Sequence, residues 1–194
     1  MLTKDEKEEL WKVFPELETE RLYLVRLTEE NIPELLKIWG DPVVARYNGF
    51  PPMDELELKN SLKFNEDEYR DCRGIRWGLF LKSIGQIIGT AGYNRWETNI
   101  GNKAMIGADV SREFWNQGIS SGTSRCIIEY GFSQMRLHQI EAETSPENYP
   151  AQKVLEKLGF TLEGTLRDAY HWKSEYHTMR IYSLLEHEFK ANKN

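Results

Sequence analysis

The sequence has too few cysteines for a disulfide framework and no spacing that would hold a structural metal. Cys72 and Cys126 are the two cysteines among 194 residues, and neither belongs to a closely spaced cysteine pair. The four histidines are not spaced as zinc ligands either. We therefore expect neither disulfides nor a metal cofactor.

Long apolar runs and an excess of positive charge are also missing. No apolar run approaches the roughly 20 residues that a membrane-spanning helix needs, and the first residues lack the apolar core of a secretory signal. We therefore expect a soluble, cytoplasmic protein with no membrane partner. The net charge of −6 disfavours direct binding to nucleic acid, which needs clustered Lys and Arg. It suits a positively charged partner, such as an amine.

Two common nucleotide-binding motifs are absent. The chain has no G-x-x-x-x-G-K-[ST] loop and no G-x-G-x-x-G after a first strand. The first absence argues against a P-loop NTPase and the second against a dinucleotide-binding Rossmann unit.

The residues that are present suffice for one domain with a buried core, since 40% are hydrophobic and 12% aromatic. Residues 1–15 read as an N-terminal helical extension, with Thr3 and Glu6 at capping-box spacing and Pro15 at its end. Residues 16–194 then form a single domain.

Hydrophobic periodicity predicts a mixed α/β (α+β) sheet with helices packed on it. Short turns between the three central strands predict an antiparallel meander, and the segment 41–52 reads as a looser connection. The strands at 103–110 and 139–144 flank a long helix and should run parallel, as a right-handed crossover. Strands are expected at 21–27, 76–82, 86–96, 103–110, 139–144, 160–170 and 175–184, and helices at 3–14, 28–39, 54–69, 118–135 and 150–158.

The stretch from Ala108 to Gly122 bears most directly on function. A strand ends there, crosses a polar loop and enters the long helix through Gly118, Ser120 and Ser121. Small residues let a ligand approach the backbone, and the free N–H groups of a first helical turn attract a pyrophosphate. The alternative is that these residues merely shape a tight strand-to-helix turn. The loop alone leaves both interpretations open.

A second segment, from Glu143 to Phe160, adds a further set of motifs. Together the two segments resemble the GNAT superfamily of N-acetyltransferases, and most closely its RimJ/RimL-like branch, which acetylates the N-termini of ribosomal proteins. The motifs that carry the resemblance are ETERL at 18–22, DP at 41–42 with RY at 46–47, GTAG at 89–92, FW at 114–115 with Gly118, PEN at 146–148, LEKLGF at 155–160, EG at 163–164 and YSLL at 182–185.

The resemblance implies the GNAT fold, a mixed and mostly antiparallel sheet in which two parallel strands splay apart to hold acetyl-CoA. It implies that the backbone at Ala108, Asp109 and Val110 pairs with the pantetheine arm and stabilises the oxyanion formed when an amine attacks the thioester. Asn148 matches the asparagine that hydrogen-bonds the pantetheine. Capping the helix before Pro150 is an alternative role for it, and both roles can hold.

The resemblance also assigns the pyrophosphate to the loop that opens the long helix. The usual Q/R-x-x-G-x-G/A pattern reads here as WNQGIS, which keeps the central glycine and replaces others with Asn116 and Ser120. The residues whose backbone N–H groups would hold the pyrophosphate are Trp115, Asn116, Gln117, Gly118, Ile119, Ser120 and Ser121.

The implied catalytic groups depart from the family pattern. Glu143 matches the position of a general base in some related N-terminal acetyltransferases, with an ordinary sheet-face carboxylate as the alternative. Tyr170 stands where some RimL-type enzymes carry a glutamate base. Leu155 and Ala151 replace a tyrosine and a serine that would protonate the leaving thiolate. Proton donation by Tyr149, Tyr170 or water, and unassisted departure of the thiolate, remain open.

The implied reaction is transfer of an acetyl group from acetyl-CoA to a primary amine by direct attack. The acceptor is a protein N-terminal α-amine or a small amine, and its pocket is expected near 46–53 and 170–176. From the resemblance to the family we also expect a homodimer. The competing hypothesis is a catalytically degenerate acyl-CoA-binding or regulatory protein, motivated by the changes at Ala151, Leu155 and Tyr170.

Overall fold

The computed structural model describes residues 2–48, 51–98, 101–172 and 174–191. An eight-stranded sheet runs in the order β1-β2-β3-β4-β5-β6-β8-β7. Its neighbouring strands are antiparallel except β5 and β6, which are parallel, so the predicted fold class is confirmed. The strands are β1 (Leu17–Glu18), β2 (Leu22–Arg26), β3 (Ile75–Leu81), β4 (Gln86–Glu97), β5 (Lys103–Val110), β6 (Gln139–Thr144), β7 (Thr161–Trp172) and β8 (Glu175–Leu185).

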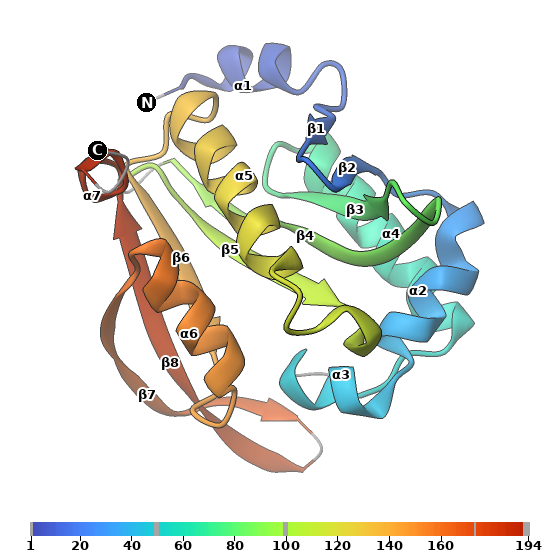
Figure 1. Ribbon diagram of the computed structural model, residues 1–194. Coiled ribbons are helices and arrows are strands. Elements are labelled where there is room, and N and C mark those ends of the chain that lie inside the picture. Colours follow the sequence, from blue (N-terminus) through green and yellow to red (C-terminus); the bar gives the residue numbers. More distant parts are fainter. Residues whose placement is uncertain (1, 49–50, 99–100, 173, 192–194) are drawn as a thin grey trace.

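Helices cover both faces of the sheet (Figure 1). Helices α5 and α6 lie on one face, and α2 and α4 lie behind the other. Each layer buries its own apolar cluster against the strands. The helices are α1 (Lys4–Leu10), α2 (Ile32–Trp39), α3 (Pro42–Asn48), α4 (Glu55–Arg70), α5 (Ile119–Ser133), α6 (Tyr149–Leu158) and α7 (Glu186–Ala191), with short 3-10 turns at Glu29–Asn31 (η1) and Arg112–Phe114 (η2).

The helices at the N-terminus and after α2 differ from the prediction, and the second difference affects the site, because Val44 and Tyr47 line the cavity. The first helix ends at Leu10 rather than Phe14, because Trp11 leaves the helical path and its side chain enters the core. The segment predicted as loose contains α3. Asp41 accepts a hydrogen bond from the Val43 N–H at 2.8 Å, and Val44 is buried, so a local cap and packing stabilise this short helix.

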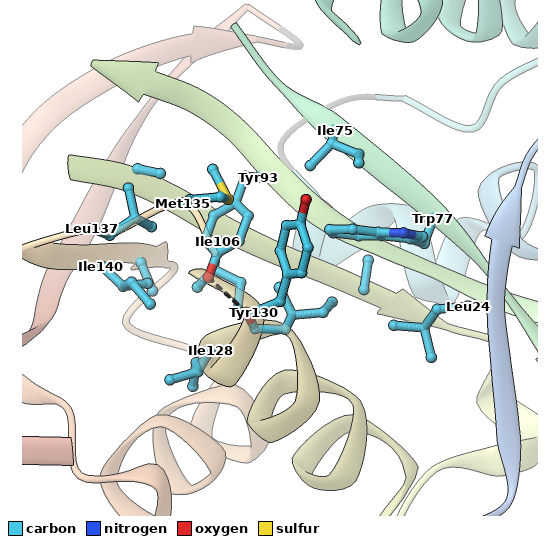
Figure 2. Close-up of a cluster of buried hydrophobic side chains, with 14 of the residues drawn as sticks. Leu24, Ile75, Trp77, Tyr93, Ile106, Ile128, Tyr130, Met135, Leu137 and Ile140 are labelled. Atoms are coloured by element: carbon cyan, nitrogen blue, oxygen red, sulfur yellow. Dashed lines mark hydrogen bonds between the residues drawn. The ribbon is translucent and has the colours of Figure 1, made fainter. Parts of the chain in front are cut away.

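Tyr93 fixes α5 across the sheet, as Figure 2 shows. Its ring is buried, and its hydroxyl donates a hydrogen bond to the Ile127 carbonyl at 2.9 Å. Tyr130 packs edge-on against Trp77 at 5.6 Å between ring centroids. The position of α5 on the strands is therefore defined by both a buried hydrogen bond and aromatic packing.

The parallel strands β5 and β6 pair over three residues and then separate. The pairs are Lys103–Gln139, Ala104–Ile140 and Met105–Glu141. Beyond them, β5 continues to Val110 along β4, and β6 continues to Thr144 along β8. The predicted splay is confirmed.

A β-bulge in β4 lies where the two strands begin to separate. Tyr93 pairs with Ile106 and Arg95 with Met105, so Asn94 is an extra residue in β4. A bulge bends its strand and increases the local twist. The bulge therefore coincides with the point at which β5 leaves β6.

Trp11 gives a test of how the N-terminal segment contributes to stability. Its side chain is 4% exposed and donates a hydrogen bond to the Tyr130 hydroxyl at 3.0 Å. We expect Trp11→Ala to lower the free energy of unfolding by about 3–5 kcal/mol, because it leaves a cavity in the core. Urea denaturation measures this. Val13→Ala, at a side chain 78% exposed, should change stability by less than about 0.5 kcal/mol. Equal small effects would contradict the packing role of Trp11.

Candidate active site

The separation of β5 from β6 opens a cavity of about 740 Å³, within the range of roughly 300–1,000 Å³ that is usual for ligand pockets. Its walls come from β5, the loop before α5, the start of α5, the end of β6 and one side of α6. Among the predicted site residues, those that line it are Ala108, Asp109, Val110, Trp115, Asn116, Gly118, Ile119, Ser120, Ser121, Glu143, Asn148 and Tyr170.

The end of β5 presents backbone to this cavity. Residues 106–110 pair with β4 along one edge, and β6 has left the other edge. Backbone N–H and C=O groups along such an edge need a partner, which water or an extended ligand can supply. Ala108, Asp109 and Val110 therefore lie where a ligand could pair as a strand.

The Asp109 side chain belongs to a polar cluster on the cavity wall. Its carboxylate accepts hydrogen bonds at 3.3 Å from the Trp39 indole and from the Arg76 guanidinium. Arg76 also donates to the Thr90 hydroxyl at 2.9 Å and to Asn94 at 2.7 Å. The Arg76 side chain is 11% exposed. Burial lowers its pKa, and the charge of Asp109 opposes that shift.

The loop between β5 and α5 takes a conformation that favours anions. Asn116 and Gly118 have φ of 60° and 76°, in the left-handed region. Asn and Gly are the residues that adopt it most readily. A left-handed residue followed by a right-handed helical turn directs successive N–H groups into one concavity. Trp115 anchors this loop through an indole hydrogen bond of 2.7 Å to the Val110 carbonyl.

The start of α5 adds donors to the same concavity. The first hydrogen bond within the helix runs from the Gly122 N–H to the Gly118 carbonyl at 3.0 Å. The N–H groups of Ile119, Ser120 and Ser121 precede it, so they have no acceptor within the helix and their dipoles favour an anion.

Gln117 lies outside the cavity lining. Its carbonyl accepts a hydrogen bond from Arg21 at 2.8 Å, and its side chain donates to the Glu113 carbonyl at 2.8 Å. These contacts hold the loop from outside. Arg21 therefore supports the candidate site; the sequence places it in a strand and in the ETERL motif and does not predict this contact.

Asn148 caps α6 and also faces the cavity; the cap is confirmed, and the contact with pantetheine stays a prediction. It is the N-cap residue of α6, and its Oδ1 accepts a hydrogen bond from the Ala151 N–H at 3.2 Å. It also lines the cavity. Since the cap uses Oδ1, the Nδ2 hydrogens are the groups that can donate to a ligand carbonyl.

Glu143 and Tyr170 are brought together from β6 and β7. The Tyr170 hydroxyl donates a hydrogen bond of 2.6 Å to the Glu143 carboxylate, and Arg95 lies 3.6 Å from the other carboxylate oxygen. The hydrogen bond to Glu143, with burial, raises the pKa of Tyr170, whereas Arg95 opposes the shift. Tyr170 is therefore a neutral phenol around pH 7.

Of the other residues considered from the sequence for proton donation or acceptor binding, some line the cavity and others do not. Ala151 and Leu155 line the cavity and offer no proton, whereas Tyr149 is 65% exposed and lies outside the lining. Tyr47 lines the cavity and packs near Trp115, with 6.2 Å between ring centroids. Positions 49–50 and 173, within the expected acceptor segments, lie outside the described residues, as does the side chain at 172.

Arg76, Asn94, Lys153 and Lys157 also line the cavity, and the sequence reading did not select them. Arg76 is a charged residue within an otherwise apolar strand, and this pattern could have indicated a functional role for it. Nothing in the sequence distinguishes Asn94, which is the extra residue of the β-bulge in β4. The two lysines read in sequence as part of a solvated helix face.

Two features are absent from the part of the chain that the structure describes. Within the described ranges, no group of three or more His, Cys, Asp or Glu residues is arranged to hold a metal ion. Among the helices described, none is long and apolar enough to cross a membrane.

The structure thus combines an α/β sheet, a wedge between two parallel strands and a helix N-terminus that opens onto the same cavity. Residues 21–161 match the family described as "Acetyltransferase (GNAT) domain". The chain belongs to the GNAT acetyltransferase family, and the resemblance seen in the sequence is confirmed.

Proteins with similar sequences are named as N-acetyltransferases. "Uncharacterized N-acetyltransferase p20" of Bacillus licheniformis is 33% identical over 174 residues, covering 89% of this chain and 97% of that protein. Spermidine N(1)-acetyltransferase of Escherichia coli is 24% identical over 177 residues, covering 90% of this chain and 86% of that protein.

Solved structures share the fold. A GNAT-family acetyltransferase from Bacillus anthracis superposes with a TM-score of 0.79 at 22% identity, covering 90% of this chain and all of that one. RimL, a ribosomal-protein α-N-acetyltransferase in complex with coenzyme A, gives 0.79 at 18% identity, covering 88% of this chain and 98% of that one.

Two glycines near the start of α5 allow a matched test of the loop geometry. A Cβ at Gly118 or Gly122 would meet nothing within 4 Å, so neither change causes a clash. Gly118→Ala should lower stability by about 1–2 kcal/mol because its φ is left-handed. Gly122→Ala should raise it by about 0.5–1 kcal/mol because it lies inside the helix. Chemical denaturation of both variants is the measurement, and effects of the same sign would contradict the assigned conformation of Gly118.

Proposed function

We propose that this protein transfers an acetyl group from acetyl-CoA to a primary amine by direct attack. The observation that carries the proposal is the wedge between β5 and β6, which places a Glu143–Tyr170 pair beside exposed backbone of β5. Acetyl-CoA supplies an activated thioester. The open strand edge, the concavity at Gly118 and the cavity volume all fit an extended phosphorylated thiol ester.

The binding steps follow from backbone geometry. The N–H groups at Gly118 to Ser121 hold the pyrophosphate at the positive end of α5. The backbone at Ala108 to Val110 pairs with the pantetheine arm, and Asn148 donates through Nδ2 from the opposite wall. A β5 N–H directed at the thioester carbonyl stabilises the negative charge that develops on its oxygen.

Glu143 acts as the general base in this proposal. An amine must be neutral to attack, and an N-terminal α-amine with a pKa near ~8 is largely protonated at pH 7. The Glu143 side chain is 15% exposed and held by Tyr170 and Arg95, so its carboxylate is oriented to accept a proton directly or through water. Tyr170 keeps its phenol proton at pH 7, since its pKa is raised from an already high value. It can pass this proton to the leaving sulfur and regain one from protonated Glu143 through their hydrogen bond.

The acceptor is a protein N-terminal α-amine or a small amine. The cavity combines Glu143 with apolar side chains of Val44, Tyr47, Met105 and Met179, a lining that suits an amine carried on an apolar group. The names of relatives supply two classes for the first assays, namely ribosomal-protein N-termini and spermidine.

Ala151 and Leu155 favour one alternative, an acyl-CoA-binding regulatory protein without turnover. Both line the cavity where a proton donor would act. This alternative predicts binding of CoA by calorimetry and no thiol release with peptides, polyamines or other primary amines. Measurable turnover that depends on Glu143 rejects it.

Glu143→Gln tests the general base. We expect kcat/KM for the best amine to fall by about 10²–10⁴-fold, with the affinity for acetyl-CoA unchanged, because the substitution removes the proton acceptor and keeps the side-chain shape. Thiol release reports the rate and calorimetry reports the binding.

Glu141→Gln is the matched control. Glu141 lies two residues earlier on the same face of β6, pairs with Lys103 at 2.8 Å and is not part of the cavity lining. Its rate should remain within about threefold of the parent. Equal rates in the two variants, or full activity of Glu143→Gln, would remove Glu143 from the mechanism.

A further inference from the structure

Two lysines that line the cavity, Lys153 and Lys157, have no role in the proposed mechanism. In the described part of the chain, the cationic residues of the lining are Arg76, Lys153 and Lys157. Arg76 is engaged by Asp109 and Asn94. Neither lysine has a carboxylate oxygen within 4.0 Å in the ion pairs found for the described residues.

Lys153 and Lys157 lie four residues apart on α6. Residues at this spacing share one helix face, separated by about 6 Å along the axis. Two like charges at this spacing repel each other slightly. An anion bound between the two ammonium groups would replace this repulsion with a net attraction. Both side chains are exposed at the rim, so they can adjust to a ligand.

The opposite rim is formed by the start of α5. Ser120, Ser121 and Ser124 line the same cavity as the two lysines, and α5 and α6 lie side by side on one face of the sheet (Figure 1). An anion between the helices therefore meets the positive end of α5 on one side and two ammonium groups on the other.

The α5 side carries no formal positive charge of its own. From Phe114 to Ser124 the sequence has no lysine, arginine or histidine. Backbone N–H groups can hold the pyrophosphate, but CoA carries a second anionic group, the 3′-phosphomonoester, with a charge of about −1.5 to −2 at pH 7. Lysine is a mobile point charge suited to a phosphate.

We propose that Lys153 and Lys157 bind the 3′-phosphate of CoA and make the protein selective for CoA over 3′-dephospho-CoA. The assignment rests on the proposed function, since it takes the carrier to lie between β5 and β6. It adds a specificity site on α6 that is independent of the catalytic pair.

The test is calorimetric titration of the parent and its variants with CoA and with 3′-dephospho-CoA. We expect the parent to prefer CoA by about 20-fold or more. Lys153→Gln and Lys157→Gln should each weaken CoA binding about fivefold, and the double variant about 20-fold, with little change for 3′-dephospho-CoA. The preference should also shrink at 0.5 M salt, because the lysines are exposed.

Two further variants serve as controls. Lys63→Gln removes the same charge from an exposed position on α4, outside the cavity, and should leave the preference intact. The double Lys→Arg variant at 153 and 157 should retain it. A double Gln variant that keeps the parental preference, or an equal loss in Lys63→Gln, overturns the proposal. Failure of the parent to bind either compound instead overturns the proposed function.

Discussion

Hydrogen bonding between β5 and β6 stops after Met105 and Glu141, and the candidate site depends on that interruption. A parallel pair that continued to Val110 and Thr144 would satisfy its own backbone groups and close the cavity. The bulge at Asn94 bends β4 where β5 departs. The sheet therefore retains a strand edge in its middle, where a ligand can take the place of a strand.

The surrounding elements keep that edge open and equip it. Tyr93 and Tyr130 hold α5 across the strands, which places its N-terminus at the mouth of the wedge. Trp115 and Arg21 hold the preceding loop in shape. Side chains thus fix the geometry, and in the proposed function the peptide groups bind the carrier. This division of roles fits the departures from the family motif at Asn116 and Ser120, because neither change removes the backbone N–H groups.

Much of the fold could be predicted from the sequence, because short turns predict antiparallel neighbours and a long helix predicts a parallel crossover. Helix α3 was missed because Gly40-Asp41-Pro42 reads as a stop and its stability comes from packing of Val44. The predicted residues of the cavity followed from the resemblance, which did not single out Arg76, Asn94, Lys153 or Lys157 as site residues. Three contacts could not be predicted, because each joins positions that are distant in the sequence. They are the contact of Arg76 with Asp109, the hydrogen bond between Tyr170 and Glu143, and the shared cavity lining of Lys153 and Lys157 with the start of α5.

Amide hydrogen exchange with and without acetyl-CoA tests the central claim most directly. If the carrier pairs with β5 in the wedge, exchange should slow in peptides covering 106–110 and 118–122, while β2 (Leu22–Arg26) on the far side of the sheet stays unchanged. Saturating acetyl-CoA that leaves 106–110 exchanging at the rate of the free protein would contradict the account.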